Sequence, residues 1–297
     1  MSQTIKNKFT LGQFLKKYNS DEVCLEEIKN IVYPQGITCP KCKKVQKFYK
    51  IKDRSVYSCG VCRHQVYPLK DTIFHHSSTP LTIWFYVMWV MIQTRSGVSA
   101  KTIQRETGVT YKCAFRMCHQ IRKLMADDGK PMDGTLEADE TYVGGKGWNK
   151  RYVSGEEKPK EILAGVLQRG GKIHLRHIPN TGKWTMLKHI QENVDPTATI
   201  YTDELGAYKQ LTKAGFKHSS VNHNDTYVIK GTDIHTNSIE GFWSLFKRGV
   251  EGVFTHISPK YLEAYANEYG WRYEHRRLSG EMFSELLNQV ALKKRLA

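Results

Sequence analysis

The distribution of hydrophobic and polar residues predicts a helical region in the first half of the chain. Residues 81–94 are almost uniformly apolar, which predicts a helix buried on most of its surface. Helical spacing of apolar residues follows at 99–107 and 110–125, with a break at Gly108-Val109. This pattern is the outline of a helix-turn-helix, whose second helix can enter the major groove of DNA. An ordinary helical hairpin with a solvated basic face has the same pattern.

Alternating strand and helix patterns follow a stretch rich in glycine, aspartate and proline at 127–134. Strands are expected at 136–143, 162–167, 173–178 and 198–202, and helices at 184–194 and 237–248. The sequence RGGK at 169–172 is typical of a hairpin turn between the second and third strands. The order of these elements matches the α/β arrangement of ribonuclease-H-like folds.

The composition indicates the chemical nature of a partner. The 297 residues are 40% hydrophobic and 25% charged, which excludes a globally disordered chain. Lysine and arginine number 45 against 29 aspartate and glutamate, so the formal net charge is +16. A charge of this sign favours a polyanionic partner, most often nucleic acid.

Neither a secretory segment nor a membrane span is indicated. The opening residues, MSQTIKNKFT, are polar and basic, and no apolar stretch follows them. The longest apolar run, 81–92, has 12 residues and is interrupted by Thr82, whereas a membrane helix needs roughly 20. We therefore expect a cytoplasmic protein without a membrane partner.

Four cysteines have the spacing of a structural zinc site. Cys39 and Cys42 form one CxxC pair, Cys59 and Cys62 form a second, and 16 residues separate the pairs. Each CxxC turn directs two thiolates towards one ion, and a short hairpin between the pairs would bring them together. We therefore expect a zinc ribbon that binds Zn²⁺. Three cysteines without this spacing are expected to be buried hydrophobic residues or inert thiols, namely Cys24, Cys113 and Cys118.

Basic residues in the second helix of the helix-turn-helix pattern are candidates for DNA contact. This helix contains no acidic residue, and the preceding helix contains one, Glu106. The candidates belong to the recognition helix or to its phosphate-facing flank, and they are Tyr111, Lys112, Arg116, Arg122 and Lys123.

Carboxylates at two predicted strand ends indicate metal-dependent phosphodiester chemistry. Asp139 lies in or at the end of the strand at 136–143, and Asp203 directly follows the strand at 198–202. Strands adjacent in the sheet would present both carboxylates at the same edge. Magnesium prefers such hard oxygen ligands, and two ions orient the nucleophile and stabilise the leaving oxygen. We therefore expect Asp139 and Asp203 to bind Mg²⁺ or Mn²⁺.

A third carboxylate is expected from the helix at 237–248. Asn237, Glu240 and Lys247 are spaced by 3 and 7 residues, so they project from one helical face. Glu240 is expected to bind the metal and Lys247 to contact a phosphate, with Arg248 as a further DNA contact. Asn237 stays open as the alternative third residue.

Other residues close to these positions fit the site less well. Strand alternation turns Glu140 to the face opposite Asp139, although a shift of register would exchange the two. Glu137 and Glu204 are also disfavoured as ligands. The glycine-rich loop at 144–147 offers Lys146 as a DNA contact near the scissile phosphate, and a plain hairpin loop is the alternative.

Four segments of the chain carry a resemblance to a known family. They are EADETYVGGK (137–146), YTD (201–203), VNH (221–223) and HTNSIEGFWSLFKR (235–248). Together they resemble bacterial insertion-sequence transposases of the ISXO type, whose DDE domain follows an N-terminal zinc ribbon. The similarity runs from about residue 21 to residue 277 and is most specific in the last segment. No chemical role is assigned to His223 or His235 within these segments.

The resemblance implies a catalytic mechanism and a substrate. It implies cutting and joining of double-stranded DNA, at terminal inverted repeats and in target DNA, with catalytic Mg²⁺ or Mn²⁺. By this likeness Asp139 and Asp203 are the first two catalytic carboxylates. The third family position is Asn or Glu, and Glu240 is favoured over Asn237 because it is charged and because Lys247 follows seven residues later. Synapsis of two DNA ends implies a homo-oligomer.

These expectations combine into an α/β protein with a ribonuclease-H-like catalytic core, preceded by a small zinc ribbon and a helix-turn-helix-like segment. The expected segments are the zinc-ribbon region at 1–75, the helical DNA-binding segment at 76–130, the DDE catalytic domain at 131–280 and a helical tail at 281–297. Two alternatives to a transposase stay open. One is a non-cutting zinc-ribbon DNA-binding regulator derived from a transposase, and the other is a metal-dependent nuclease without joining activity.

Overall fold

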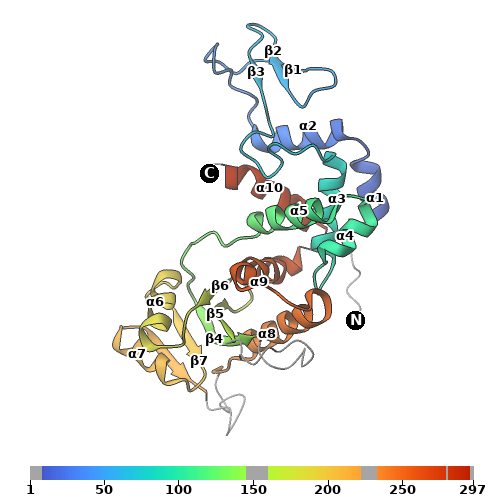
Figure 1. The fold of residues 1–297 in the computed structure, drawn as a ribbon. Coiled ribbons are helices and arrows are strands. Elements are labelled where there is room, and N and C mark those ends of the chain that lie inside the picture. Colours follow the sequence, from blue (N-terminus) through green and yellow to red (C-terminus); the bar gives the residue numbers. More distant parts are fainter. Residues whose placement is uncertain (1–8, 145–159, 222–232, 279, 295–297) are drawn as a thin grey trace, which may run out of the picture. The chain divides into compact units, whose positions relative to one another are not determined.

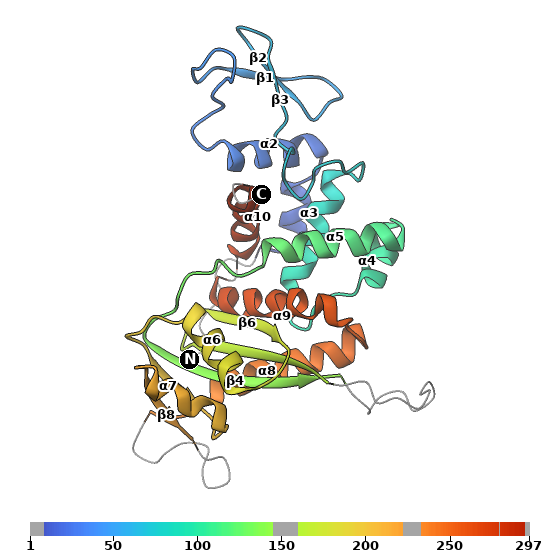
Figure 2. The ribbon, with the colours of Figure 1, turned by 60° about the vertical axis from the view of Figure 1, so that its left-hand side comes forward.

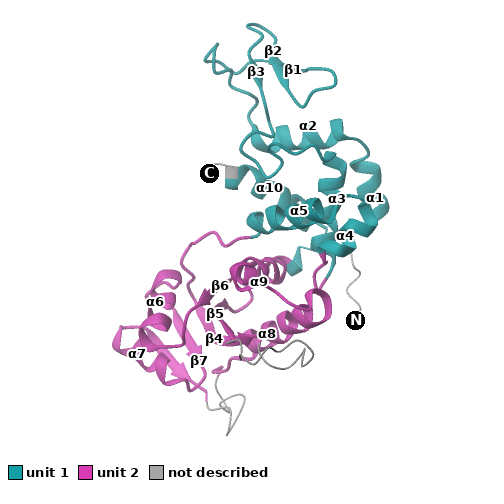
Figure 3. Cartoon of the chain, in the orientation of Figure 1, with its two compact units in different colours: residues 1–94, 100–125, 276–297 teal, residues 95–99, 126–275 magenta. Residues whose placement is uncertain are grey.

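The chain forms two compact units, which Figure 3 colours separately. The computed structural model describes residues 9–144, 160–221, 233–278 and 280–294. Unit 1 comprises residues 1–94, 100–125 and 276–297, and unit 2 comprises residues 95–99 and 126–275. Each unit buries its own set of apolar side chains.

Unit 1 begins with two helices and continues into a small antiparallel sheet (Figure 1). The helices are α1 at Leu11–Lys17 and α2 at Asp21–Val32, for which the sequence analysis made no assignment. The sheet has the order β1-β2-β3, with strands at Phe48–Lys50, Tyr57–Cys59 and Gln65–Val66. The hairpin expected between the two CxxC pairs is therefore present as β1 and β2.

Further helices form the rest of unit 1. They are α3 at Leu81–Gln93, α4 at Ala100–Thr107, α5 at Tyr111–Leu124 and α10 at Met282–Lys294. Helices α3, α5 and α10 contact one another, and α3 and α10 also contact α2. Trp84, Phe85 and Met88 of α3 are fully buried, as the nearly uniform apolar sequence predicts. From α10, Phe283 packs against the rings of Phe14 and Tyr18.

Helices α4 and α5 are the two helices of the predicted helix-turn-helix pattern. Gly108 ends α4 with a φ of +72°, a left-handed conformation that favours glycine. Thr110 caps α5, because its hydroxyl accepts a hydrogen bond of 3.3 Å from the backbone N–H of Cys113. The expected DNA-facing role of Arg122 is wrong. Its side chain is only 2% exposed, because α5 turns this residue into the core of unit 1.

A mixed five-stranded sheet forms the centre of unit 2. Its strands are β4 at Thr135–Val143, β5 at Glu161–Gln168, β6 at Ile173–Ile178, β7 at Thr199–Thr202 and β8 at Lys217–Ser220. The strand order is β6-β5-β4-β7-β8. Strands β4, β5 and β6 pair antiparallel, whereas β7 pairs parallel with both β4 and β8. The four predicted strands are confirmed, and β8 adds an edge strand that the sequence analysis did not assign.

Helices cover both faces of this sheet (Figures 1 and 2). The first face packs against α6 at Lys183–Asn193 and α7 at Lys209–Lys213, and the second packs against α8 at Asn237–Gly249 and α9 at Pro259–Glu274. Shorter helical segments are η2 at Gly206–Tyr208, η3 at Val250–Phe254 and η4 at His275–Arg277. This layered arrangement confirms the α/β class and agrees with the expected ribonuclease-H-like core.

Strand alternation separates the two cores of unit 2. On β4, Leu136 and Ala138 face α6, and on β5, Leu163 and Leu167 face α8 and α9. Alternate residues of β4 therefore lie on the α8 side of the sheet, and these include Glu137 and Asp139.

Across the described part of the chain, no helix is both long enough and apolar enough to cross a membrane.

Candidate functional site

The four predicted zinc ligands lie together in the ribbon. The Sγ atoms of Cys39, Cys42, Cys59 and Cys62 are all within 4.8 Å of one another. Sγ of Cys39 is 3.5 Å from Sγ of Cys62, and Sγ of Cys42 is 4.0 Å from Sγ of Cys59. Four thiolates around a tetrahedral Zn²⁺, each about 2.3 Å from the metal, would lie about 3.8 Å apart. The cysteine cluster therefore fits a structural zinc ion.

Two matching turns direct these thiolates towards one point. Each CxxC pair is followed by a residue with a positive φ, Lys43 at 59° and Arg63 at 61°. The backbone N–H of Lys43 donates to the carbonyl of Cys39 over 2.8 Å, and that of Arg63 donates to the carbonyl of Cys59 over 3.1 Å. The two halves of the site therefore have the same local structure.

The other cysteines lie outside this cluster. Cys24 and Cys118 are buried, whereas Cys113 is half-buried. Burial raises the pKa of the Cys24 thiol to about 12. A thiol in this state is neither a nucleophile nor a metal ligand at neutral pH, as expected from the sequence.

Strand pairing places two of the predicted catalytic carboxylates beside one another, one within β4 and one directly after β7. Glu137 on β4 pairs with Tyr201 on the parallel strand β7. Asp139 and Asp203 each lie two residues further along their strands, in the same direction. Asp139, in the middle of β4, therefore lies beside Asp203, which directly follows the neighbouring strand β7.

Burial and neighbouring charges act together on Asp139. Burial, followed by the negative charges of Glu140, Asp203 and Glu240, raises the pKa of Asp139 to about 7. Burial and the charge of Asp203 also raise the pKa of Glu140. A divalent cation would offset this repulsion between carboxylates, so the donor set fits Mg²⁺ or Mn²⁺.

Helix α8 brings Glu240 into the hollow that Asp139 lines. Glu240 lies in the first turn of α8, and its Oε1 accepts a hydrogen bond of 2.8 Å from the hydroxyl of Thr236. Asp139, Glu240 and Lys247 line one open hollow, which Arg248 also lines. Asn237 is exposed at the start of α8 and is not among the residues that line this hollow.

A glycine opposite Asp139 allows α8 to approach the sheet closely. Gly165 on β5 pairs directly with Asp139. A Cβ atom at Gly165 would lie 2.8 Å from the ring of Trp243, which comes from α8 and lines the same hollow. The missing side chain therefore leaves the space that the Trp243 ring occupies.

Asp203 lines a neighbouring hollow, together with Tyr208 and His218. Among the described residues, the carboxylate oxygens of Asp139, Asp203 and Glu240 do not form a group within 4.8 Å of one another. Asp203 therefore lines a different hollow from the one that Asp139 and Glu240 share.

The neighbouring glutamates have different surroundings. Glu140 lies on the α6 side of β4, where its Oε2 accepts a hydrogen bond from the Tyr208 hydroxyl. Glu204 is exposed after β7. Glu137 is fully buried and accepts hydrogen bonds from the first turn of α8. This contact joins residues about a hundred positions apart in the chain, so no local sequence pattern predicts it.

The predicted DNA contacts are mostly exposed. Lys112 and Arg116 are exposed on α5, and the guanidinium of Arg116 lies 5.9 Å from the ring of Trp84. Lys247 and Arg248 are exposed on α8 and line the hollow that holds Asp139. Lys146 lies outside the described residues.

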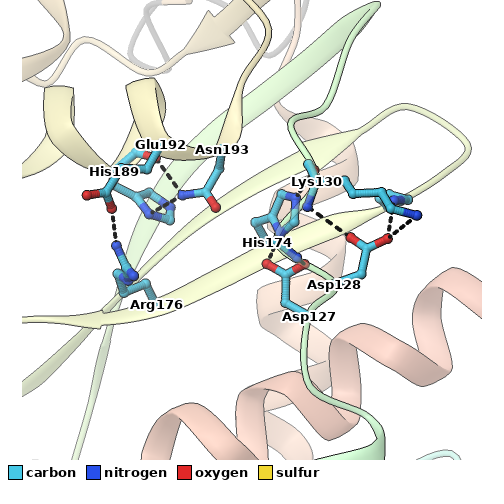
Figure 4. A network of polar contacts seen from close by, with 10 residues as sticks. Asp127, Asp128, Lys130, His174, Arg176, His189, Glu192 and Asn193 are labelled. Atoms are coloured by element: carbon cyan, nitrogen blue, oxygen red, sulfur yellow. Dashed lines mark hydrogen bonds and ion pairs between the residues drawn. The ribbon is translucent and has the colours of Figure 1, made fainter. Parts of the chain in front are cut away.

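A separate polar network connects the segment before β4 to β6 (Figure 4). Asp127, Asp128 and His174 bring three possible metal ligands within 4.8 Å of one another. Oδ2 of Asp128 pairs with Nζ of Lys172 at 3.0 Å and with Nζ of Lys130 at 3.6 Å. His174 contacts Asp127 and the carbonyl oxygen of Lys130. Because two lysines neutralise the charge of Asp128, we assign this network a structural role in unit 2 and not a role in metal binding.

Two family models match the parts of the chain that contain the carboxylates and the four cysteines. Residues 131–274 match the family model described as an ISXO2-like transposase domain. Residues 19–65 match the model of a transposase zinc-ribbon domain. The first match covers the sheet with its carboxylates, and the second covers the four cysteines.

Two relatives are similar over most of their own length. The first is an uncharacterized protein in transposable element ISH50 of Halobacterium salinarum, with 25% identity over 274 residues, 84% of this chain and 91% of the relative. The second is an uncharacterized transposase-like protein of Haemophilus influenzae, with 30% identity over 125 residues, 42% of this chain and 93% of the relative. With both domain matches in the expected order, this chain belongs to the family of ISXO2-like transposases that carry an N-terminal zinc ribbon.

Proposed function

We propose that this chain is a DDE transposase that cuts DNA at the terminal inverted repeats of its element and joins the cut end to target DNA. The observation that supports this best is the position of Asp139, which shares a hollow with Glu240 and whose pKa is raised to about 7 by burial and by nearby carboxylates that include Asp203 and Glu240. A protein that only binds DNA gains nothing from clustered acids that face phosphates.

Each residue of the site has a distinct role in this proposal. Asp139, Asp203 and Glu240 would hold Mg²⁺ or Mn²⁺. The ions would activate the attacking oxygen and stabilise the leaving oxygen. Lys247 and Arg248 bind phosphates of the DNA strand and hold it over the hollow that they line with Asp139 and Glu240.

The reaction has two steps at this one site. Water attacks a phosphodiester at the element end, and the bond to the 3′-oxygen breaks, which leaves a free 3′-hydroxyl. That hydroxyl then attacks a phosphodiester of target DNA, and a new phosphodiester forms as the old one breaks. The enzyme forms no covalent intermediate with DNA.

The remaining surfaces serve DNA binding. The net charge of +16 supports double-stranded DNA as the partner. Lys112 and Arg116 on α5, together with the zinc ribbon, contact the terminal repeats, and Lys146 contacts DNA near the cleavage site. The two DNA ends of the element must be held together for joining, so we expect the active form to be a homo-oligomer. Because its substrate is DNA, we expect it to act in the cytoplasm.

The test is mobilisation of a marker flanked by the element's own ends, in cells that produce the intact protein, Asp203→Asn or Glu204→Gln. The matched control changes the exposed neighbour of Asp203. We expect movement with the intact protein and with Glu204→Gln, and none with Asp203→Asn, although all three bind end DNA. Binding without movement by the intact protein would indicate a regulator. Cleavage without joined products would indicate a nuclease.

A further inference from the structure

A buried carboxylate from the sheet holds the first turn of α8. Glu137 on β4 is fully buried and accepts hydrogen bonds from the backbone N–H groups of Ser238, over 2.8 Å, and Ile239, over 3.0 Å. The Ser238 hydroxyl donates a third hydrogen bond over 3.0 Å. These N–H groups belong to the start of a helix, where no carbonyl within the helix can accept from them. Glu137 therefore caps α8 from outside the helix.

The residue that would ordinarily cap α8 has another contact. Thr236 is at the N-cap position, yet its side chain accepts no capping hydrogen bond. Its hydroxyl instead donates to Oε1 of Glu240 over 2.8 Å. Because Glu137 satisfies the helix N–H groups, the Thr236 hydroxyl can orient the Glu240 carboxylate.

Arg169, in the turn after β5, holds Glu137 in place. Its Nε donates to Oε1 of Glu137 over 2.8 Å, and its Nη2 donates to the carbonyl of His235 over 3.0 Å. Its Nη1 pairs with Asp233 over 2.6 Å, and its guanidinium lies 5.0 Å from the ring centre of Tyr201. One guanidinium thus links the capping carboxylate, the segment that enters α8 and strand β7.

We propose that Glu137 is a positioning residue of the metal site, which sets the place of Glu240 relative to Asp139. Glu137 and Asp139 lie two residues apart on the same face of β4. The strand that carries one metal-binding carboxylate therefore anchors the helix that carries another. Glu137 itself is closed to solvent and its oxygens are engaged by Arg169 and α8, so it binds no metal. The inference rests on the proposed function.

Mn²⁺ binding to the full-length protein without DNA tests this role by calorimetric titration. Glu137→Gln preserves the size of the side chain, but its NH₂ group would face the N–H donors of Arg169 and of the first turn of α8. We expect it to weaken Mn²⁺ binding by about 10–100-fold, as other residues that orient metal ligands do. The matched control is Glu268→Gln, which alters another fully buried glutamate that pairs with an arginine, Arg272, on α9. This control should leave Mn²⁺ affinity unchanged.

A double-mutant cycle separates positioning from a general loss of structure. If Glu137 acts through Glu240, then Glu137→Gln should weaken Mn²⁺ binding little further in the Glu240→Gln background. Full additivity of the two effects would overturn the inference, and so would equal Mn²⁺ affinities of Glu137→Gln and Glu268→Gln. In both cases the proposed function would stand.

Two further outcomes complete the test. If Glu137→Gln does not fold, Ser238→Ala replaces it, because this variant removes only the hydroxyl contact and leaves the backbone contacts. A loss of Mn²⁺ affinity with Ser238→Ala that is smaller than the loss expected for Glu137→Gln supports the inference. An Mn²⁺ affinity equal to that of the intact protein overturns it. If the intact protein binds no Mn²⁺, or binds it equally well as Asp139→Asn, the proposed function itself fails and the inference fails with it.

Discussion

The hydroxyl of Tyr208 donates a hydrogen bond of 3.1 Å to Oε2 of Glu140. Tyr208 is buried in the core on the α6 side of the sheet, so this bond holds Glu140 on that side. Its neighbour Asp139 lies on the α8 side, with Glu240. Glu140 also lines the hollow of Asp139, but strand alternation and the Tyr208 bond hold its carboxylate on the opposite face, and a one-residue change in register would have exchanged the two residues.

This arrangement predicts unequal effects for the two residues. Asp139→Asn should lower cleavage of end DNA by more than about 100-fold, beyond the roughly 10–100-fold typical of residues that only orient ligands. Glu140→Gln should retain most activity, because its amide oxygen can still accept from Tyr208. Cleavage of labelled end DNA by each purified variant measures the difference. Equal losses would show that Glu140 also binds metal.

Much of this site follows from sequence patterns. The CxxC spacing indicates which thiolates can share an ion, and the strand patterns around Asp139 and before Asp203 assign these residues to two strands of one sheet. Hydrophobic alternation also identified four of the strands in unit 2. These features are local, so each can be inferred from a short segment of sequence.

Other features depend on contacts between distant segments. Strand β8 reads KHSS and has no apolar alternation, so its pairing with β7 defines it. Arg122 looks like a surface cation, but the packing of α5 buries it. Glu137 resembles its acidic neighbours in sequence, and only the approach of α8 gives it a capping role. A single sequence does not specify such tertiary contacts.

The proposed third metal ligand can be tested by comparing two residues in one turn of α8. Glu240 lines the hollow with Asp139, whereas Asn237 is exposed at the start of α8. We expect Glu240→Gln to lower cleavage more than about 100-fold, and Asn237→Ala to have a much smaller effect. Cleavage assays over a series of Mn²⁺ concentrations measure both. A larger loss for Asn237→Ala would assign the third position to Asn237.

The raised pKa of Asp139 predicts how pH affects the metal-free protein. This pKa is about 7 in the folded chain against 3.8 as the ordinary value, so between these values the folded state binds more protons. The free energy of unfolding should therefore decrease as pH rises from about 4 to about 7. Asp139→Asn removes the repulsion and should raise the melting temperature at pH 8, by about 2–4 °C for each kcal/mol relieved.

Calorimetry at pH 4 and pH 8 checks this expectation. At pH 4 the advantage of Asp139→Asn should largely disappear, because the carboxyl is then protonated in the folded protein. Adding Mg²⁺ at pH 8 should stabilise the intact protein and not the variant. Glu204→Gln, which alters an exposed carboxylate nearby, should behave as the intact protein does. A variant with a lower melting temperature at pH 8 would contradict the assignment.

His189 on α6 predicts a second pH effect, of opposite sign (Figure 4). Burial, with a smaller contribution from the charge of Arg176, lowers the pKa of His189 to about 4. Its Nδ1 lies 3.3 Å from the side-chain amide of Asn193, and its Nε2 is buried without a hydrogen-bond partner among the described residues. Charging this ring in the folded state is therefore unfavourable.

The unfolded chain takes up this proton at a pKa near 6.5, so stability should be lost as pH falls from about 6.5 to about 4, by up to about 3 kcal/mol. His189→Leu should flatten this part of the curve of unfolding free energy against pH, measured by urea denaturation. The matched control His256→Gln alters an exposed histidine of the same unit and should leave the curve unchanged. An unaltered slope in His189→Leu would contradict the burial argument.

The cysteine cluster predicts one zinc ion per chain and a fold that depends on it. Cys42→Ser should lose bound zinc, because oxygen replaces one of four sulfur ligands. The three short strands of the ribbon have little core of their own, so loss of the metal should unfold them. Zinc content by atomic emission and binding to end DNA would both fall, while Mn²⁺ binding to unit 2 should persist. Cys113→Ser alters a cysteine outside the cluster and should keep its zinc. Zinc retained by Cys42→Ser would show that the four thiolates do not share an ion.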